Sequence, residues 1–140
     1  EHEMKGVPVR IGIGQRDLDQ NQVEIARRDT KAKTMVALEG VTEFVSDLLA
    51  QMQDDLFNKA KKFREDNSHN VDSYDEFKER IEEGGFFHCH WDGTPETEAR
   101  IKEETKATIR CIPLDQVKEE GKCMVTGEKS EGRVIIARAY

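Results

Sequence analysis

The chain has 140 residues, of which 36% are hydrophobic and 36% are charged, and its formal net charge is −7. An acidic chain is repelled by nucleic-acid phosphates, so this charge excludes a general nucleic-acid coat and allows only a local basic contact face. The length is sufficient for one ordinary domain, or for two small ones with modest cores.

The positive charge is concentrated near the start of the chain. Residues 1–38 contain seven Lys or Arg and six acids, whereas the other 102 residues contain fifteen and twenty-three. We therefore expect any contact with a polyanion to involve this first segment.

The sequence also bears on the cellular compartment. No apolar run approaches the roughly eighteen residues of a membrane span, and no charged and apolar leader is visible. The cysteines, Cys89, Cys111 and Cys123, are odd in number and irregular in spacing, which argues against a disulfide framework. We expect a protein of a reducing compartment, by default the cytoplasm, without membrane contact.

Alternating apolar residues predict short strands in the first part of the chain. Residues 7–13 predict one strand with its apolar side chains on one face, and residues 23–27 and 35–38 predict two more. Residues 14–17, Gly-Gln-Arg-Asp, predict a turn after the first strand, and the polar residues 18–22 continue it.

A long amphipathic helix is predicted over residues 41–63, because apolar residues recur there at spacings of three and four. We expect this apolar face to pack on the sheet as a core. Its members are Val41, Phe44, Val45, Leu48, Leu49, Met52, Leu56, Phe57, Ala60 and Phe63. Residues 64–72 are polar and predict a boundary, so we divide the chain into units 1–70 and 71–140.

The second unit opens with a predicted helix. Ser73 and Glu76 have the spacing of a capping box, and Gly84 and Gly85 end the helix after residue 83.

Further elements alternate between strand and helix. Thr94 is a predicted N-cap and Pro95 a first-turn proline for a helix over residues 96–105. Strands are predicted over residues 86–91, 107–112, 122–125 and 134–140. Both halves therefore mix helices and strands, which predicts an α/β (α+β) fold.

Several motifs carry a family resemblance. They are KGVPVRIGIGQRD from Lys5, RRDT from Arg27, IKEETKATIRCIP from Ile101, GKCMVTG from Gly121 and RVIIARAY from Arg133. In this order and spacing the chain resembles prolyl-tRNA synthetase, in the form found in archaea, eukaryotes and some bacteria.

The resemblance implies a fold and a place in a longer protein. Residues 1–70 would be the last part of a three-layer α/β anticodon-binding domain. Residues 71–140 would be the family's small C-terminal α/β domain, with a mostly antiparallel sheet and a degenerate zinc site. The catalytic domain would lie upstream, so the chain would be a fragment without adenylation activity.

The resemblance also implies a function. The parent would be a class II aminoacyl-tRNA synthetase that uses ATP and Mg to attach proline to tRNA(Pro), in the cytoplasm and as a homodimer. This fragment would contribute to anticodon recognition and support the parent's own catalytic domain.

The family's anticodon-reading positions fall on two residues of the first segment. They are Glu3, an acid before the KGVP motif, and Arg16, a cation after the first strand. A carboxylate suits the donor groups of guanine and a guanidinium suits O6 and N7, and both proline-determining anticodon bases are guanines. The alternative is that Glu3 is a frayed terminus and Arg16 a solvated turn residue.

Two further cations are candidates for tRNA phosphates. Arg27 and Arg28 stand at the end of the second predicted strand. The alternative is a solvated strand end with Asp29 as ion-pair partner, which would contribute only about 0–1 kcal/mol.

The zinc ligands of family members that have the metal correspond to Asp92, Thr97, Cys123 and Thr126 here. Only one thiolate is present among them, and threonine is not a useful zinc ligand, so we expect no zinc site at these positions. An alternative ligand set is His88, His90 and Cys123, because residues two apart on a strand share a face.

Without zinc, hydrophobic packing would have to supply the folding free energy that the metal often contributes, about 10 kcal/mol in apparent terms. The aromatic and aliphatic residues expected to do so are Phe86, Phe87, Trp91, Ile109 and Ile135.

The chain ends in Ala-Arg-Ala-Tyr. In the family a terminal tyrosine carboxylate reaches toward the catalytic domain, so the resemblance gives Tyr140 that role. Two alternatives to the synthetase fragment stay open: a free-standing tRNA-binding or synthetase-associated module without a catalytic domain, and a purely structural interaction domain.

Overall fold

A computed structural model describes residues 1–139 of the chain. They form two compact units, one from Glu1 to Lys61 and one from Lys62 onward. The domain boundary after residue 70, which the polar segment 64–72 suggested, stays a prediction.

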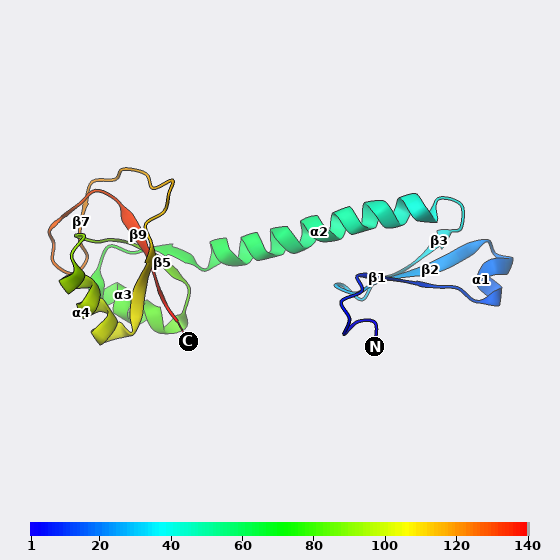
Figure 1. Ribbon diagram of the computed structural model, residues 1–140, viewed down its shortest axis with the longest axis horizontal. Coiled ribbons are helices and arrows are strands. Elements are labelled where there is room, and N and C mark those ends of the chain that lie inside the picture. The colour runs from blue at the N-terminus through cyan, green and yellow to red at the C-terminus, as the bar shows by residue number, and fades with distance from the viewer. Residues whose placement is uncertain (140) are drawn as a thin grey trace. The chain divides into compact units, whose positions relative to one another are not determined.

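Unit 1 contains an antiparallel sheet with strand order β1-β2-β3 (Figure 1). Its elements are β1 (Val9–Gly12), α1 (Gln15–Asp19), β2 (Gln22–Arg27) and β3 (Lys33–Ala37). The mixed fold class predicted from the sequence is confirmed in this unit.

The turn predicted at residues 14–17 is wrong, because the short helix α1 covers residues 15–19. The turn predicted at residues 18–22 is partly correct, because residues 20 and 21 form a turn between α1 and β2. Gly14 is the N-cap of α1, and the Gly14 N–H donates to Asp17 Oδ2 at 2.8 Å. This side-chain bond satisfies a backbone donor at the helix start, so the polar residues close a helical turn and not a loop.

The helix α2 (Val41–Asp66) packs its first half on the sheet of unit 1. The core of this unit joins Val23 and Ile25 of β2 to Leu48 and Met52 of α2.

The predicted continuous core face of α2 is wrong beyond Met52. Strands of four to six residues extend for about 13–20 Å, whereas a helix of 26 residues extends for about 39 Å. The helix therefore outruns the sheet, and Leu56, Phe57 and Phe63 are exposed beyond it. Leu49 is exposed before Met52 as well, so it does not belong to the core face.

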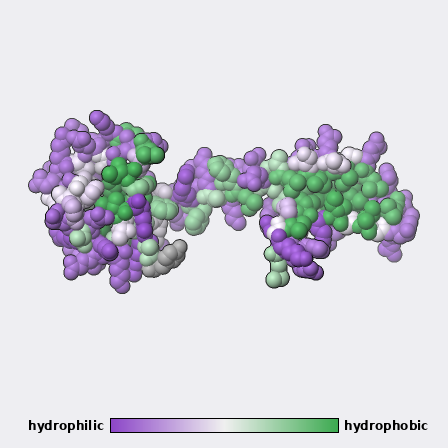
Figure 2. Space-filling model, viewed as in Figure 1, coloured by the Kyte–Doolittle hydropathy of each residue, from purple (hydrophilic) through white to green (hydrophobic). Residues whose placement is uncertain are grey.

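Apolar surface is also exposed over unit 1, as Figure 2 shows. β1 has no strand beyond it in the described sheet, so Ile11 is half exposed although its antiparallel partner Ile25 is buried. The exposed set in this unit includes Val7, Ile11, Ile13, Leu18 and Met35.

Unit 2 is built around a four-stranded sheet with order β4-β5-β9-β6, in which only the β4–β5 pair is parallel. Its elements are β4 (Ser68–Asn70), α3 (Tyr74–Arg80), the 3₁₀ turn η1 (Ile81–Glu83), β5 (Phe86–His90), α4 (Pro95–Thr105), β6 (Ala107–Cys111), β7 (Gly121–Lys122), β8 (Lys129–Ser130) and β9 (Arg133–Arg138). This arrangement agrees with the mostly antiparallel sheet that was predicted.

Two expectations for unit 2 are corrected. Residues 64–72 are not a plain polar connection, because α2 continues to Asp66 and β4 follows at Ser68. The strand predicted over residues 122–125 is replaced by the two-residue β7 and a turn.

Both predicted N-caps of unit 2 are confirmed, but the capping box at Ser73 is only half formed, since the Glu76 carboxylate accepts from Arg80 at 2.9 Å and not from the Ser73 N–H. Ser73 Oγ accepts from the Glu76 N–H at 3.5 Å, and Thr94 Oγ1 accepts from the Thr97 N–H at 3.3 Å. Pro95 occupies the first turn of α4 as expected.

One face of this sheet forms the core against α3 and α4, with Phe77, Phe87, Ile101 and Ile136 fully buried. The expected packing set is only partly correct. Phe87 lies in the core and Trp91 and Ile109 pack against it, whereas Phe86 and Ile135 line a hollow on the other face. Successive strand residues point to opposite faces, so Phe86 and Phe87 cannot share one core.

No helix in the described part of the chain is both long enough and apolar enough to cross a lipid bilayer.

Candidate nucleic-acid interface

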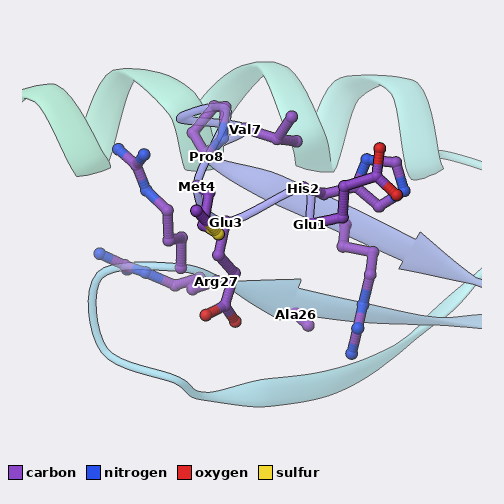
Figure 3. A pocket seen from close by; sticks show the side chains of 10 residues that line it. Glu1, His2, Glu3, Met4, Val7, Pro8, Ala26 and Arg27 are labelled. Carbon is purple, nitrogen blue, oxygen red and sulfur yellow. The ribbon is translucent and has the colours of Figure 1, made fainter.

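A hollow of about 330 Å³ lies where the first residues of the chain meet the β1–β2 ladder (Figure 3). Its wall combines carboxylates, cations and a few apolar side chains. The lining residues are Glu1, His2, Glu3, Met4, Val7, Pro8, Arg10, Ala26, Arg27 and Arg28.

The backbone explains why these residues meet. Arg10 pairs with Ala26 across the β1–β2 ladder, so both lie on the same face of the sheet. The Arg28 N–H donates to the Pro8 carbonyl at 2.9 Å, which closes the end of the ladder. At Gly6, φ is +80°, and a Cβ there would lie 3.3 Å from the Arg28 guanidinium. Glycine therefore permits both the turn and the close approach.

Glu3 is held as a carboxylate beside three cations. Its Oε2 accepts from Lys31 Nζ at 2.9 Å, and both side chains are about two-thirds exposed. The hydrogen bond and charge of Lys31, with a smaller effect of Arg10, lower the pKa of Glu3 below its ordinary value. This carboxylate is ionised at neutral pH and can exchange its exposed partner for another donor.

Arg27 is more firmly engaged. Its guanidinium donates to Asp29 at 2.7 Å and to Asp55 of α2 at 2.9 Å, and its side chain is 14% exposed. The hydrogen bond from Arg27 lowers the pKa of Asp29 to about 2, and these two acids raise the pKa of Arg27. The ion pair between Arg27 and Asp29, which was the alternative to a phosphate contact, is therefore present. The second ion pair, with Asp55, joins β2 to α2.

Arg16 does not share the hollow. It lies on α1, after the far end of β1, whereas Glu3, Arg27 and Arg28 gather at the beginning of that strand. The four residues of β1 place about 10 Å of backbone between the two positions. The structure thus brings together three of the four predicted contacts.

Arg10 is the residue that sequence reasoning missed. It entered only as part of the charge count, although its place between Val9 and Ile11 could have predicted an outward-facing cation. Within residues 1–139, neither Arg10 nor Arg28 nor Arg16 forms a salt bridge. In unit 1, these three guanidiniums are therefore the ones available to a polyanion.

The positions that correspond to zinc ligands form a hydrogen-bonded cluster around Asp92. Asp92 Oδ2 accepts from the hydroxyls of Thr97 and Thr126, each at 2.8 Å. Oδ1 accepts from the Thr94 hydroxyl at 2.9 Å and from its N–H at 3.1 Å. One carboxylate thus joins the residue after β5, the start of α4 and the turn after β7.

This cluster does not have the donor set of a zinc site. The threonine hydroxyl protons point at the carboxylate, and only Cys123 could supply a thiolate. Burial raises the pKa of Asp92, but the bonds from Thr94, Thr97 and Thr126 outweigh it and lower the pKa to about 2.

The alternative ligand set is not assembled either. His90 is 3% exposed, and its Nδ1 lies 3.1 Å from Ser130 Oγ, whereas His88 lines the hollow on the open sheet face. Over residues 1–139, no group of three or more His, Cys, Asp or Glu is placed to hold a metal. Tyr140, the predicted contact to the catalytic domain, lies outside the described residues.

Comparisons with known proteins match both units. Residues 74–140 match the family model for the C-terminal part of prolyl-tRNA synthetase, and residues 1–48 match the model for an anticodon binding domain.

Curated relatives match over the whole chain. The proline–tRNA ligase of Porphyromonas gingivalis ATCC 33277 is 59% identical over 140 residues, which are 100% of this chain and 28% of that protein. The corresponding ligase of Parabacteroides distasonis is 57% identical with the same coverage. That of Flavobacterium psychrophilum is 55% identical over 141 residues, or 29% of its length.

The chain therefore spans less than a third of the length of these relatives. They are bacterial proteins, so they give no support to the archaeal and eukaryotic-like type that the motifs suggested.

Proposed function

We propose that the chain is the C-terminal region of a prolyl-tRNA synthetase, with its anticodon-binding domain, and that unit 1 contributes to recognition of the tRNA(Pro) anticodon. The observation that carries this proposal is the hollow around Glu3. There an ionised carboxylate shares the hollow with Arg10 and Arg28, which form no salt bridge with any described residue, inside the segment that matches the anticodon-binding model.

The chemistry of the hollow suits a guanine base. The Glu3 carboxylate can accept from the N1–H and N2–H₂ groups, and a guanidinium such as Arg28 can donate to O6 or to a neighbouring phosphate. Exchange of Lys31 for a base costs little, because an exposed ion pair contributes only about 0–1 kcal/mol.

Arg10, Arg16 and Arg28 have a second role in this proposal, as phosphate contacts. Arg10 lies on β1, Arg16 lies on α1, and Arg28 directly follows β2 beside the start of β1. A tRNA loop that follows this edge would meet all three. Arg27 contributes indirectly, because its bonds to Asp29 and Asp55 fix the end of β2.

The activity of the longer protein is part of the proposal. It would be a proline–tRNA ligase that uses ATP and Mg, acts as a homodimer in the cytoplasm, and contains a catalytic domain that the C-terminal unit supports. The present chain would not activate proline by itself. Its second unit would fold without zinc, and the archaeal and eukaryotic-like type stays a prediction.

The test measures binding of a tRNA(Pro) anticodon stem-loop to the full-length ligase at low salt. Glu3→Gln is expected to reduce the preference for guanine over adenine by roughly tenfold, since a matched base contact is worth about 1–3 kcal/mol. Arg28→Ala and Arg16→Ala are expected to weaken binding to both loops and to reduce its salt dependence.

Lys102→Ala is the control, because it removes an exposed cation of unit 2 that lines neither hollow. If none of the unit 1 variants changes affinity or base preference relative to this control, the anticodon role of these residues is refuted.

A further inference from the structure

A second hollow lies on the open face of the unit 2 sheet, opposite the core. It has a volume of about 490 Å³ and is larger than the hollow of unit 1. Its floor is formed by Phe86, His88, Cys111 and Ile135, and the other lining residues are Arg64, Glu65, Ser68 and Arg110.

A β-bulge builds one side of this hollow. Ile109 pairs with Ile136 on the core face, whereas Cys111 pairs with Ile135 on the open face, so Arg110 is the extra residue between them. Without the bulge, Ile109 and Cys111 would share a face. The irregularity brings Cys111 into one row with Ile135 and His88 and places Arg110 beside it. Bulges commonly re-aim side chains next to functional sites.

The end of α2 forms the opposite side. The Ser68 hydroxyl donates to the Arg64 carbonyl at 2.7 Å, and the Phe86 N–H donates to the Asn67 carbonyl at 2.8 Å. Gly85 has φ of +107°, and a Cβ there would lie 2.7 Å from that carbonyl oxygen. Glycine thus allows the last turn of α2 to sit tightly against the start of β5.

The two arginines of this hollow differ from the other arginines of unit 2. Arg80, Arg100, Arg133 and Arg138 each form a salt bridge with a nearby acid. Arg64 and Arg110 form none with any described residue. Burial and the charge of Arg133 lower the pKa of His88, so this imidazole of the floor is uncharged at neutral pH.

The hollow therefore combines an apolar floor with two arginines that form no salt bridge with a described residue, and with one acid, Glu65, on a chain that is acidic as a whole. Arginine and aromatic residues are enriched in the cores of protein interfaces, where they anchor partner side chains. The apolar surface also continues beyond the hollow, because Ile112, directly after Cys111, is 57% exposed. An extended apolar surface of this kind fits a polypeptide better than a small free anion.

We propose that the hollow lined by Arg64, Phe86, Arg110 and Ile135 docks a segment of the longer protein outside the present sequence, which presents a large apolar side chain beside a carboxylate. The proposal rests on the proposed function in one respect, that the chain is the C-terminal part of a longer ligase. The chain spans 28% of such relatives, so most of the protein that could cover the hollow lies elsewhere.

Cys111 provides an intrinsic reporter for this contact. It is exposed in the present chain, whereas Cys89 and Cys123 are buried. In the full-length ligase, we expect iodoacetamide to label Cys111 at least about tenfold more slowly than free N-acetylcysteine, as quantified by peptide mass spectrometry. Labelling at a rate close to that of the free thiol would show an uncovered hollow and would overturn the proposal.

Charge reversal tests the part played by the arginines. The double variant Arg64→Glu/Arg110→Glu is expected to restore fast labelling of Cys111, because it repels the proposed carboxylate. Loss of nearby positive charge disfavours the thiolate form and would by itself slow the reaction of Cys111 with iodoacetamide. Faster labelling would therefore report that Cys111 has become accessible. The control Lys102→Glu/Lys122→Glu makes the same change in net charge on exposed residues away from the hollow. Equal protection in both double variants would refute the docking mode.

Two further readings separate the alternatives. Cys89 and Cys123 must stay unlabelled in each variant, because their labelling would report unfolding. If the double variant unfolds by this criterion, the labelling rate of Cys111 in the single variant Arg110→Glu is compared with that of the wild type instead. Protection that increases with protein concentration would indicate a second copy and would contradict the proposal. Anticodon stem-loop binding is measured in the same samples, so a failure of the anticodon proposal leaves the labelling result interpretable.

Discussion

The Asp92 carboxylate shows how one residue can join three segments of a domain. It accepts four hydrogen bonds from Thr94, Thr97 and Thr126, and these bonds hold its pKa at about 2, below the ordinary value of 3.8. An acid with a lowered folded-state pKa stabilises the fold above its unfolded pKa and loses this contribution as the pH falls toward the folded value. The contribution is therefore complete above about pH 5 and is lost between roughly pH 4 and pH 2.

We predict that Asp92→Asn lowers the free energy of unfolding of unit 2 by at most about 2 kcal/mol at pH 7, since one pKa unit corresponds to about 1.4 kcal/mol. The difference from the wild type should shrink toward pH 2, where the wild-type carboxyl also becomes protonated. Urea unfolding followed by Trp91 fluorescence measures this, because Trp91 is the single tryptophan and lies beside the cluster. A pH-independent difference between the two proteins would contradict the role of the charge.

At the scale of elements, the two N-caps of unit 2 differ in strength. Thr94 both caps α4 and donates to Asp92, whereas Ser73 accepts only one long bond of 3.5 Å from Glu76. We predict that Thr94→Ala destabilises unit 2 by about 1–2 kcal/mol and Ser73→Ala by about 0.5 kcal/mol. Thr94→Ser keeps the hydroxyl and should recover most of the loss in the same urea unfolding measurement. Equal effects of the two alanine variants would show that the bond to Asp92 adds nothing.

The helix α2 offers a second contrast within one element. Met52 is 3% exposed in the core of unit 1, whereas Phe57 is 63% exposed. We predict that Met52→Ala costs about 2–3 kcal/mol, because it removes buried volume, and that Phe57→Ala changes stability by less than about 0.5 kcal/mol. Urea unfolding followed by far-ultraviolet circular dichroism compares the two in this chain. A larger cost for Phe57 would mean that the outer half of the helix is packed in solution.

The same elements show what a single sequence can predict. Apolar period and cap residues predicted α2, α3 and α4, because these signals are local. The helix α1 was missed, since a glycine N-cap before five polar and apolar residues resembles a turn. The bulge at Arg110 could not be predicted, because it depends on the register with β9. For the same reason, the sequence could not distinguish Arg27, which is paired with Asp55 28 positions away, from the free Arg28.

At the scale of the whole molecule, the ion pairs divide the arginines into structural and available ones. Arg27 and Arg133 each bridge distant segments through two acids. The arginines without an acidic partner among the described residues lie in the two hollows and on α1. An acidic chain has an excess of carboxylates to neutralise its cations, so cations left unpaired at hollows point to contacts made outside the chain.

The same reasoning gives an expectation for metal removal. A structural zinc would contribute about 10 kcal/mol to folding in apparent terms, so its loss would lower the melting temperature by tens of degrees. In unit 2 the corresponding positions are joined by the hydrogen bonds of Asp92, and these bonds do not respond to a chelator. We therefore predict the same melting temperature, followed by Trp91 fluorescence, with and without excess EDTA. In the variant Cys123→Ser the melting temperature should also be the same with and without EDTA, because the buried thiol that is removed does not bind a metal. A fall of several degrees with EDTA, recovered by added zinc, would show that His88, His90 or Cys123 binds the metal after all.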